Sequence, residues 1–180
     1  MHDSTEQELE KGLQMLGLPY TAGQLASLAQ YLKLLEKWNR SYNLVAASDS
    51  SSMVSRHLLD SLAIQPFLAG SSIVDMGSGA GLPGIPLAIL NPHKEFVLVD
   101  SNGKKTRFLF QVKTTLKMDN ISVENCRIEH YQSHRQIDMV MCRAFSSLAD
   151  VVAKSQHLLS SGDKRCKLLA LKGRYPEQEL

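Results

Sequence analysis

A glycine-rich stretch in the middle of the chain, residues 73–87, most constrains how the chain can fold. It consists of a short apolar run ending at Asp75, three glycines at alternate positions, and a second apolar run with early prolines. Glycine suits a backbone with positive φ or one that closely approaches a ligand, and proline is tolerated in the first turn of a helix. The pattern therefore predicts a strand, a tight loop, and a helix that begins near Leu82 and stops before Asn91. The start of that helix would point unpaired N–H groups at whatever the loop holds.

Two nucleotide cofactors compete for this loop. Residues 79–84 match the Gly-x-Gly-x-x-Gly fingerprint of dinucleotide-binding proteins, but a literal match is not specific. Asp75 stands two residues before the first glycine, Gly77, where a carboxylate would face a pyrophosphate unfavourably but would suit an amino acid ammonium and a sulfonium. The pattern therefore favours S-adenosylmethionine over NAD. A second acid, Asp100, ends the next predicted strand and is placed to accept ribose hydroxyls; for both acids the alternative is a carboxylate that caps a helix or a turn.

Length and composition limit the other possibilities. The chain of 180 residues suffices for one domain of ordinary size plus an extension. Its three cysteines follow neither a disulfide nor a metal spacing, and His130 and His134 lack a third ligand, so we expect reduced thiols and no metal. Because the N-terminus lacks a signal-peptide pattern and no apolar run approaches the length of a membrane span, we expect a soluble, cytoplasmic protein without a membrane partner.

Charge is distributed unevenly along the chain. Residues 1–70 hold five Lys and Arg against seven Asp and Glu, whereas residues 71–180 hold fifteen against eleven. The basic excess therefore lies on the part that contains the glycine-rich loop. Such an asymmetry is compatible with a nucleic-acid partner, although solvated helix faces explain it equally well.

The first seventy residues predict helices. Capping boxes at residues 5–8 and 21–24 each precede apolar residues at helical spacing. Trp38 continues the second apolar stripe, and for this side chain core packing is preferred over base stacking. In a third predicted helix, Arg56 and Asp60 stand at i and i+4, which indicates an ion pair within the helix.

From residue 71 onward the pattern alternates between strands and helices, which is typical of a parallel sheet. The first turn of one predicted helix holds Lys104 and Lys105, which oppose the helix dipole and so hint at an anionic partner, with a solvated face as the alternative. Arg143 follows the fourth strand, at the edge where open α/β sheets bind ligands. The predicted strands are 72–76, 95–100, 121–125, 137–142 and 167–171.

Together these motifs resemble the RsmG/GidB family of bacterial small-subunit ribosomal RNA guanine-N7 methyltransferases. The resemblance implies the Rossmann-like α/β fold of class I S-adenosylmethionine-dependent methyltransferases, with residues 1–70 as an N-terminal helical extension and residues 71–180 as the core. The stretches that carry it are 38–39, 42–44, 56–61, 75–87, 100–101, 104–105, 108–109, 143–145 and 171–173.

The resemblance also implies an activity: methylation of N7 of guanosine 527, in the 530 loop of 16S rRNA, with S-adenosylmethionine as donor. The partner would be 16S rRNA in the small ribosomal subunit, and the protein is expected to be a monomer. Guanine N7 carries a lone pair and no proton, so transfer needs neither a general base nor a covalent intermediate, and orientation alone can accelerate it. No catalytic residue is therefore named. The expected cofactor-binding residues are Gly77, Gly79, Leu82, Asp100, Ile128, Glu129 and Arg143.

Two other functions stay open at this point: a non-catalytic RNA-binding or assembly factor on a methyltransferase scaffold, and an NAD-dependent oxidoreductase that uses residues 79–84. Methyltransferases of this fold have seven strands, the last two forming a hairpin at one edge, whereas this sequence predicts five. We therefore expect the native protein to continue beyond Leu180 with two strands that cover the edge of the strand at 167–171.

Overall fold

Five parallel strands form one sheet at the centre of the protein, in the order β3-β2-β1-β4-β5. The computed structural model describes residues 4–46, 53–143, 147–159, 166–173 and 177. All five predicted strands are confirmed, with ends shifted by at most two residues. They are β1 (Ser72–Met76), β2 (Glu95–Val99), β3 (Ile121–Glu124), β4 (Met139–Arg143) and β5 (Lys167–Leu171). The strand order reverses between β1 and β4, the position at which open α/β sheets bind ligands.

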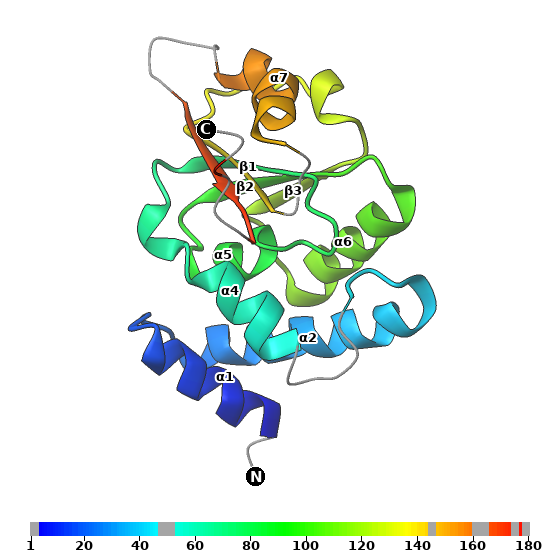
Figure 1. The fold of residues 1–180 in the computed structure, drawn as a ribbon. Helices are drawn as coiled ribbons and strands as arrows, with labels where there is room; N and C mark the ends of the chain where they lie inside the picture. The colour runs from blue at the N-terminus through cyan, green and yellow to red at the C-terminus, as the bar shows by residue number, and fades with distance from the viewer. Residues whose placement is uncertain (1–3, 47–52, 144–146, 160–165, 174–176, 178–180) are drawn as a thin grey trace.

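Helices cover both faces of the sheet (Figure 1). One face carries α5 (Gly84–Leu90) and α6 (Gly103–Leu116), and the other carries α7 (Leu148–Leu159) with the short 3-10 turn η3 (Ile128–His130). A further helical layer packs on α5 and α6. It consists of α1 (Ser4–Met15), α2 (Ala22–Tyr42), η1 (Val54–Leu59), α4 (Asp60–Leu62) and η2 (Gln65–Phe67).

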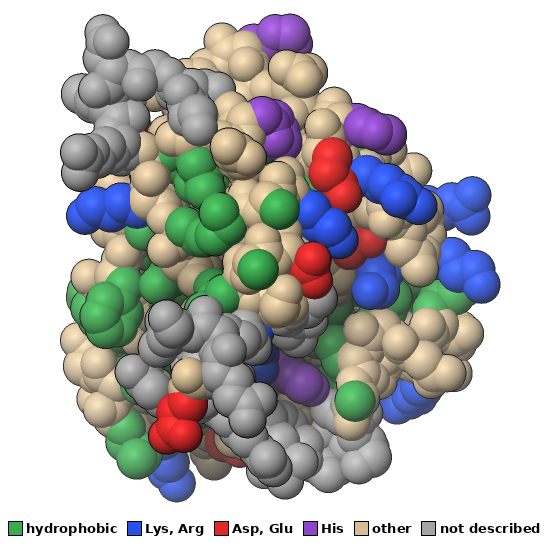
Figure 2. Space-filling view, turned by 45° about the horizontal axis from the view of Figure 1, so that its top comes forward, with side chains coloured by type: hydrophobic (Ala, Val, Ile, Leu, Met, Phe, Trp, Pro, Cys, Tyr) green, Lys and Arg blue, Asp and Glu red, His purple; other side chains and the backbone are tan. Residues whose placement is uncertain are grey.

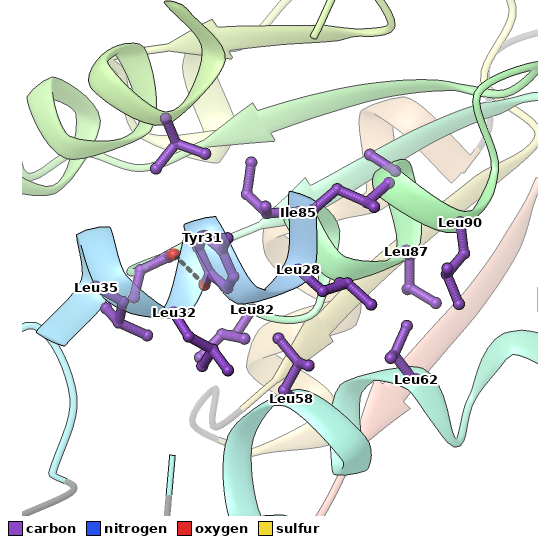
Figure 3. Packing of buried hydrophobic residues seen from close by; sticks show 14 of the residues in the cluster. Leu28, Tyr31, Leu32, Leu35, Leu58, Leu62, Leu82, Ile85, Leu87 and Leu90 are labelled. Atoms are coloured by element: carbon purple, nitrogen blue, oxygen red, sulfur yellow. Dashed lines mark hydrogen bonds between the residues drawn. The ribbon is translucent and has the colours of Figure 1, made fainter. Parts of the chain in front are cut away.

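Two hydrophobic cores lie on the two sides of the sheet, because successive side chains of a strand point to opposite faces. Ile73 and Met141 belong to the core that also contains the N-terminal helices, whereas Val74 and Val140 belong to the core under α7. Leucines from α2, η1, α4 and α5 meet in the first core (Figure 3). This core is continuous from α1 to the sheet, so the N-terminal helices are packed directly on the part of the chain that contains the glycine-rich loop.

Helix α2 forms as the sequence predicts. The Thr21 side chain accepts a hydrogen bond from the backbone N–H of Gln24, and the Gln24 side chain accepts one from the backbone N–H of Thr21, which confirms the capping box. Trp38 packs against the core, with its ring 5.6 Å from the ring of Phe108 in α6. The buried leucines of the predicted stripe are Leu25, Leu28, Leu32 and Leu35.

The starts of two other helices differ from the prediction. Thr5 does not cap α1, because that helix already includes Ser4. Helix α5 begins at Gly84, two residues after Leu82, and Gly81, with a φ of +85°, lies in the turn that precedes it. Until that point the chain forms a turn rather than a helix.

The third predicted helix is a π-helix over η1 followed by one turn of α-helix in α4. The spacing of apolar residues alone does not distinguish a π-helix from an α-helix. Segments of π-helix are often found at functional sites. The side chain of Arg56, predicted to pair with Asp60, lies outside the described residues. In the described part of the chain, no helix is long and apolar enough to cross a membrane.

Candidate functional site

A pocket of about 380 Å³ opens at the carboxyl ends of the strands. Residues that end or follow β1, β2, β3 and β4 meet there, together with lysines from α6 and α7. Charges of both signs therefore surround the pocket, and Figure 2 shows Lys and Arg side chains close to Asp and Glu side chains on the right of the face that it presents. The charged lining residues are Asp100, Lys105, Arg127, Glu129, Arg143 and Lys154.

The structure brings most of the predicted site residues to this pocket. Two of them do not line the pocket: Leu82 is 8% exposed and packs in the core (Figure 3), and Gly79 lies in the glycine-rich loop next to the lining residue Lys105. Sequence reasoning missed Arg127 and Lys154; Lys154 lies on α7, far along the chain, and no local pattern marks it. The predicted residues that line the pocket are Gly77, Asp100, Ile128, Glu129 and Arg143.

The glycine-rich loop is tied to its neighbours by backbone hydrogen bonds. The N–H groups of Gly77 and Ser78 both donate to the carbonyl oxygen of Val99 at the end of β2, over 2.8 and 3.1 Å. Gly77 has a φ of +70°, a conformation that L side chains rarely adopt, and it lines the pocket directly. The backbone can therefore approach a ligand at this position without a Cβ in the way.

Asp100 is held in one orientation by the backbone around it. Its Oδ2 accepts a 2.8 Å hydrogen bond from the N–H of Gly79, and its Oδ1 accepts a 2.8 Å bond from the N–H of Asn102. Asn102 in turn caps α6 by accepting from the N–H of Lys104. Each carboxylate oxygen has a second lone pair, so Asp100 both shapes the turn and keeps accepting capacity toward the pocket.

Asp75 lies behind the loop and not in the pocket lining. It is fully buried, and its Oδ2 accepts a 2.9 Å hydrogen bond from the N–H of Gly84 at the start of α5. Strand alternation turns Asp75 to the α5 side of the sheet, so our expectation that it faces the ligand is corrected and the helix-start alternative describes its contact. Within the described residues its Oδ1 has no hydrogen-bond partner. Burial raises the pKa of Asp75 to about 7.

Arg143 joins the end of β4 to the N-terminal helices. Its Nη1 donates to the carbonyl oxygen of His57 (3.1 Å) and to the hydroxyl of Ser61 (3.0 Å), and its Nη2 lies 3.6 Å from the carboxylate of Asp60. The partner of Asp60 in the described structure is thus an arginine from another element. Arg143 therefore lines the pocket and also fastens η1 and α4 to it.

Comparison with known proteins identifies the family. The family model described as GidB, rRNA small subunit methyltransferase G, matches residues 24–180. The chain belongs to this family. Ribosomal RNA small subunit methyltransferase G of Nitrosococcus oceani is 53% identical over 175 residues, which cover 97% of this chain and 80% of that protein. The corresponding protein of Pseudomonas syringae is 49% identical over 174 residues, with coverage of 97% and 80%.

Solved structures of other methyltransferases share the fold of this GidB-family chain. A magnesium protoporphyrin IX methyltransferase from Synechocystis with bound SAH has a TM-score of 0.54 at 18% identity, over 76% of this chain and 65% of that one. A methyltransferase from Geobacter sulfurreducens has a TM-score of 0.53 at 17% identity, over 95% and 78%. At these identities the likeness concerns the fold alone, and it confirms the predicted class I, Rossmann-like architecture.

The three cysteines of this GidB-family chain are free thiols. Burial raises the pKa of Cys142 to about 11, and desolvation likewise raises the pKa values of Cys126 and Cys166. The thiols are therefore protonated near neutral pH and poorly suited to nucleophilic attack.

Proposed function

We propose that this chain is an S-adenosylmethionine-dependent methyltransferase that methylates N7 of a guanosine in the 530 loop of 16S rRNA. The observation that carries the proposal is the pocket at the reversal of strand order, where the positive-φ Gly77 and the oriented carboxylate of Asp100 lie together. Membership in the GidB family supports the reaction and the RNA substrate, since relatives about half identical to this chain are named ribosomal RNA small subunit methyltransferase G. Membership in this family leaves the alternative of an NAD-dependent oxidoreductase without support.

The pocket residues fit S-adenosylmethionine. Asp100 would accept hydrogen bonds from the ribose hydroxyls, because its carboxylate is already oriented by two backbone N–H groups. The buried side chain of Ile128 offers an apolar surface for a purine ring. Glu129 and Lys105, which carry opposite charges and both line the pocket, suit a zwitterionic amino acid group. When bound, S-adenosylmethionine would supply an electrophilic methyl group on a sulfonium.

The chain itself contributes binding and orientation. Guanine N7 carries a lone pair and no proton, so no side chain has to act as a general base. Holding the two reactants in line can by itself supply several kcal/mol, up to roughly 7 to 11 in well-oriented systems. Rigid placement of the pocket is therefore the main requirement, and the hydrogen bonds of Asp100, the glycine-rich loop and Arg143 provide it.

We propose that the protein is a monomer and that it works in the cytoplasm, where bacterial ribosomes are assembled. Sedimentation analysis of the active protein, with and without RNA, measures the oligomeric state. Activity confined to a dimer fraction would contradict this part of the proposal.

Methyl transfer tests the main proposal directly. Labelled S-adenosylmethionine is incubated with the protein and with either unmodified small ribosomal subunits or deproteinised 16S rRNA, and the modified base is mapped. We expect label on N7 of one guanine in at least one of the two substrates. If neither substrate is labelled by protein that binds S-adenosylhomocysteine, the result would indicate the non-catalytic RNA-binding alternative.

Asp100→Asn tests the cofactor site separately from the substrate. We expect it to raise the Kd for S-adenosylhomocysteine by roughly tenfold or more, because hydrogen bonds to a charged group are worth about 1.5 to 3 kcal/mol. Asp119→Asn is the matched control, since Asp119 is exposed and lies before β3, at the opposite edge of the sheet. Calorimetry with equal Kd values for the two variants would contradict the assignment of Asp100.

A further inference from the structure

The surface beside the pocket, formed by α6 and the last turn of α2, is basic and carries exposed aromatic rings. We call it the α6 surface and define it by Arg40, Tyr42, Lys104, Arg107 and Phe110. Its charged members are exposed, and Tyr42 and Phe110 are 47% and 49% exposed. The residues of α6 in this set are spaced by three positions and therefore share one face of the helix.

The two helices lie side by side at this surface (Figure 1). The ring of Trp38 is 5.1 Å from the ring of Tyr42 and 5.6 Å from the ring of Phe108 in α6. Because Trp38 bridges the two helices, the last turn of α2 is held next to α6. Exposed arginine, lysine and aromatic side chains from two segments distant in sequence thus lie on neighbouring helices.

The two charges that α6 contributes to this face do not stabilise their own helix. Helix α6 has four basic residues and no acidic one, and Lys104 and Lys105 stand in its first turn, where positive charge opposes the helix dipole. Lys104 and Arg107 are also like charges at i and i+3. Within the part of the chain that the structure describes, neither side chain makes an ion pair or a hydrogen bond. An anionic partner would satisfy these charges.

The basic surface continues to the rim of the pocket. Lys105 lines the pocket, and a Cβ placed on Gly79 would lie 3.9 Å from the Lys105 ammonium, so this charge stands next to the glycine-rich loop. Exposed Arg127 lines the pocket as well. A polyanionic strand lying on the α6 surface would therefore reach the opening of the pocket without crossing an acidic region of α6.

We propose that the α6 surface binds single-stranded RNA next to the target guanosine, with its basic residues on the phosphates and its exposed rings stacked on unpaired bases. The proposal rests on the proposed function, because it names how that substrate is held at the pocket. Lys and Arg make the backbone contacts in protein–nucleic acid complexes, and RNA is read mainly through loops whose bases can stack on aromatic side chains. A protein partner for the same face is the competing outcome of the test.

The test compares variants of the α6 surface with a control that removes one exposed positive charge elsewhere. Lys104→Ala/Arg107→Ala removes two phosphate contacts, Phe110→Ala removes a stacking ring, and Lys11→Ala removes an exposed lysine on α1, outside this surface. The readouts are KM for the better of the two RNA substrates, the dependence of RNA affinity on salt, and the Kd for S-adenosylhomocysteine by calorimetry.

We expect the double variant to raise the KM for RNA at least about tenfold and to reduce the slope of log affinity against log salt by about one to two. Phe110→Ala should raise the KM while leaving that slope unchanged, because stacking releases no counterions. The Kd of these variants for S-adenosylhomocysteine should stay as in the unmodified chain, and Lys11→Ala should change none of the three readouts. Arg107→Lys keeps the positive charge, so its salt slope should stay close to that of the unmodified chain.

The outcomes separate this inference from the function on which it rests. Suppose that the unmodified protein methylates RNA and that the double variant has the same KM and the same salt slope. This result would overturn the inference, leave the function intact and point to a protein partner for this face. A parallel loss of S-adenosylhomocysteine affinity would also overturn it, because the change would then act through the pocket. An unmodified protein that binds RNA through this surface but transfers no methyl group would support the surface and overturn the function.

Discussion

The hydroxyl of Tyr31 donates a 2.8 Å hydrogen bond to the carbonyl oxygen of Ala80 (Figure 3). Tyr31 is fully buried in the middle of α2, and Ala80 lies in the glycine-rich loop. Burial raises the pKa of Tyr31 far above its usual range, so the hydroxyl keeps its proton and stays a donor. Through this bond the N-terminal helices hold the loop that borders the pocket.

Tyr31→Phe should therefore lower both stability and ligand affinity. The change leaves a buried carbonyl oxygen without its donor, which costs about 1 to 3 kcal/mol of unfolding free energy, and it frees the loop to move. Urea denaturation and calorimetry with S-adenosylhomocysteine measure the two effects. Tyr42→Phe is the control, because that tyrosine is about half exposed; equal behaviour of the two variants would show that the buried hydroxyl does not matter.

Gly77→Ala should weaken cofactor binding more than Gly79→Ala. Both glycines have a positive φ, +70° and +58°, so both changes carry a similar backbone cost of about 1 to 2 kcal/mol. Only Gly77 lines the pocket, and a Cβ on Gly79 would meet no atom closer than 3.8 Å. We expect a Kd for S-adenosylhomocysteine that is roughly tenfold higher for the Gly77 variant than for the Gly79 variant. Equal Kd values at equal melting temperatures would place the ligand away from Gly77.

Asp75 should make the protein less stable as the pH rises. Burial, the main cause, raises the pKa of this carboxyl from 3.8 to about 7 in the folded protein. The folded state thus binds the proton more tightly than the unfolded state; this stabilisation is complete below the unfolded pKa and is lost as pH rises through the folded pKa. At about 1.4 kcal/mol per pKa unit, the total loss is about 4 kcal/mol.

Asp75→Asn removes the titrating group while keeping an oxygen for the N–H of Gly84. Between pH 5 and pH 8 we expect the unmodified chain to lose about 2 to 3 kcal/mol of unfolding free energy relative to this variant. Urea denaturation at the two pH values gives the difference. Asp119→Asn, at an exposed position, should follow the unmodified chain; a parallel pH profile for the Asp75 variant would mean that the buried carboxyl does not take up the proton.

Arg143→Ala should destabilise the protein, whereas Arg127→Ala should not. Both arginines line the pocket, but Arg143 also bonds to His57 and Ser61 and lies near Asp60, while Arg127 is exposed. Loss of the Arg143 contacts should cost about 1 to 3 kcal/mol, and loss of Arg127 less than about 0.5 kcal/mol. Thermal and urea unfolding of both variants test this. Equal stability of the two would assign Arg143 a role in the pocket alone.

Strand positions and the order of elements were predictable because the signals are local. A short, mainly apolar run next to a glycine-rich turn defines β1 whatever lies elsewhere in the chain, and the Thr21 capping box needs only residues three positions apart. The same holds for the placement of Gly77, Asp100 and Glu129 after successive strands, since the carboxyl ends of parallel strands meet at one edge of the sheet. The sequence by itself determined these features.

The tertiary structure decided which side chains meet. The direction of the Asp75 side chain depends on which face of β1 carries α5, and the partners of Arg143 depend on how η1 and α4 pack beside β4. The arrival of Lys154 at the pocket and the bond from Tyr31 to Ala80 likewise join segments tens of residues apart. Such contacts follow from the packing of whole helices on a sheet, and no local spacing in the chain encodes them.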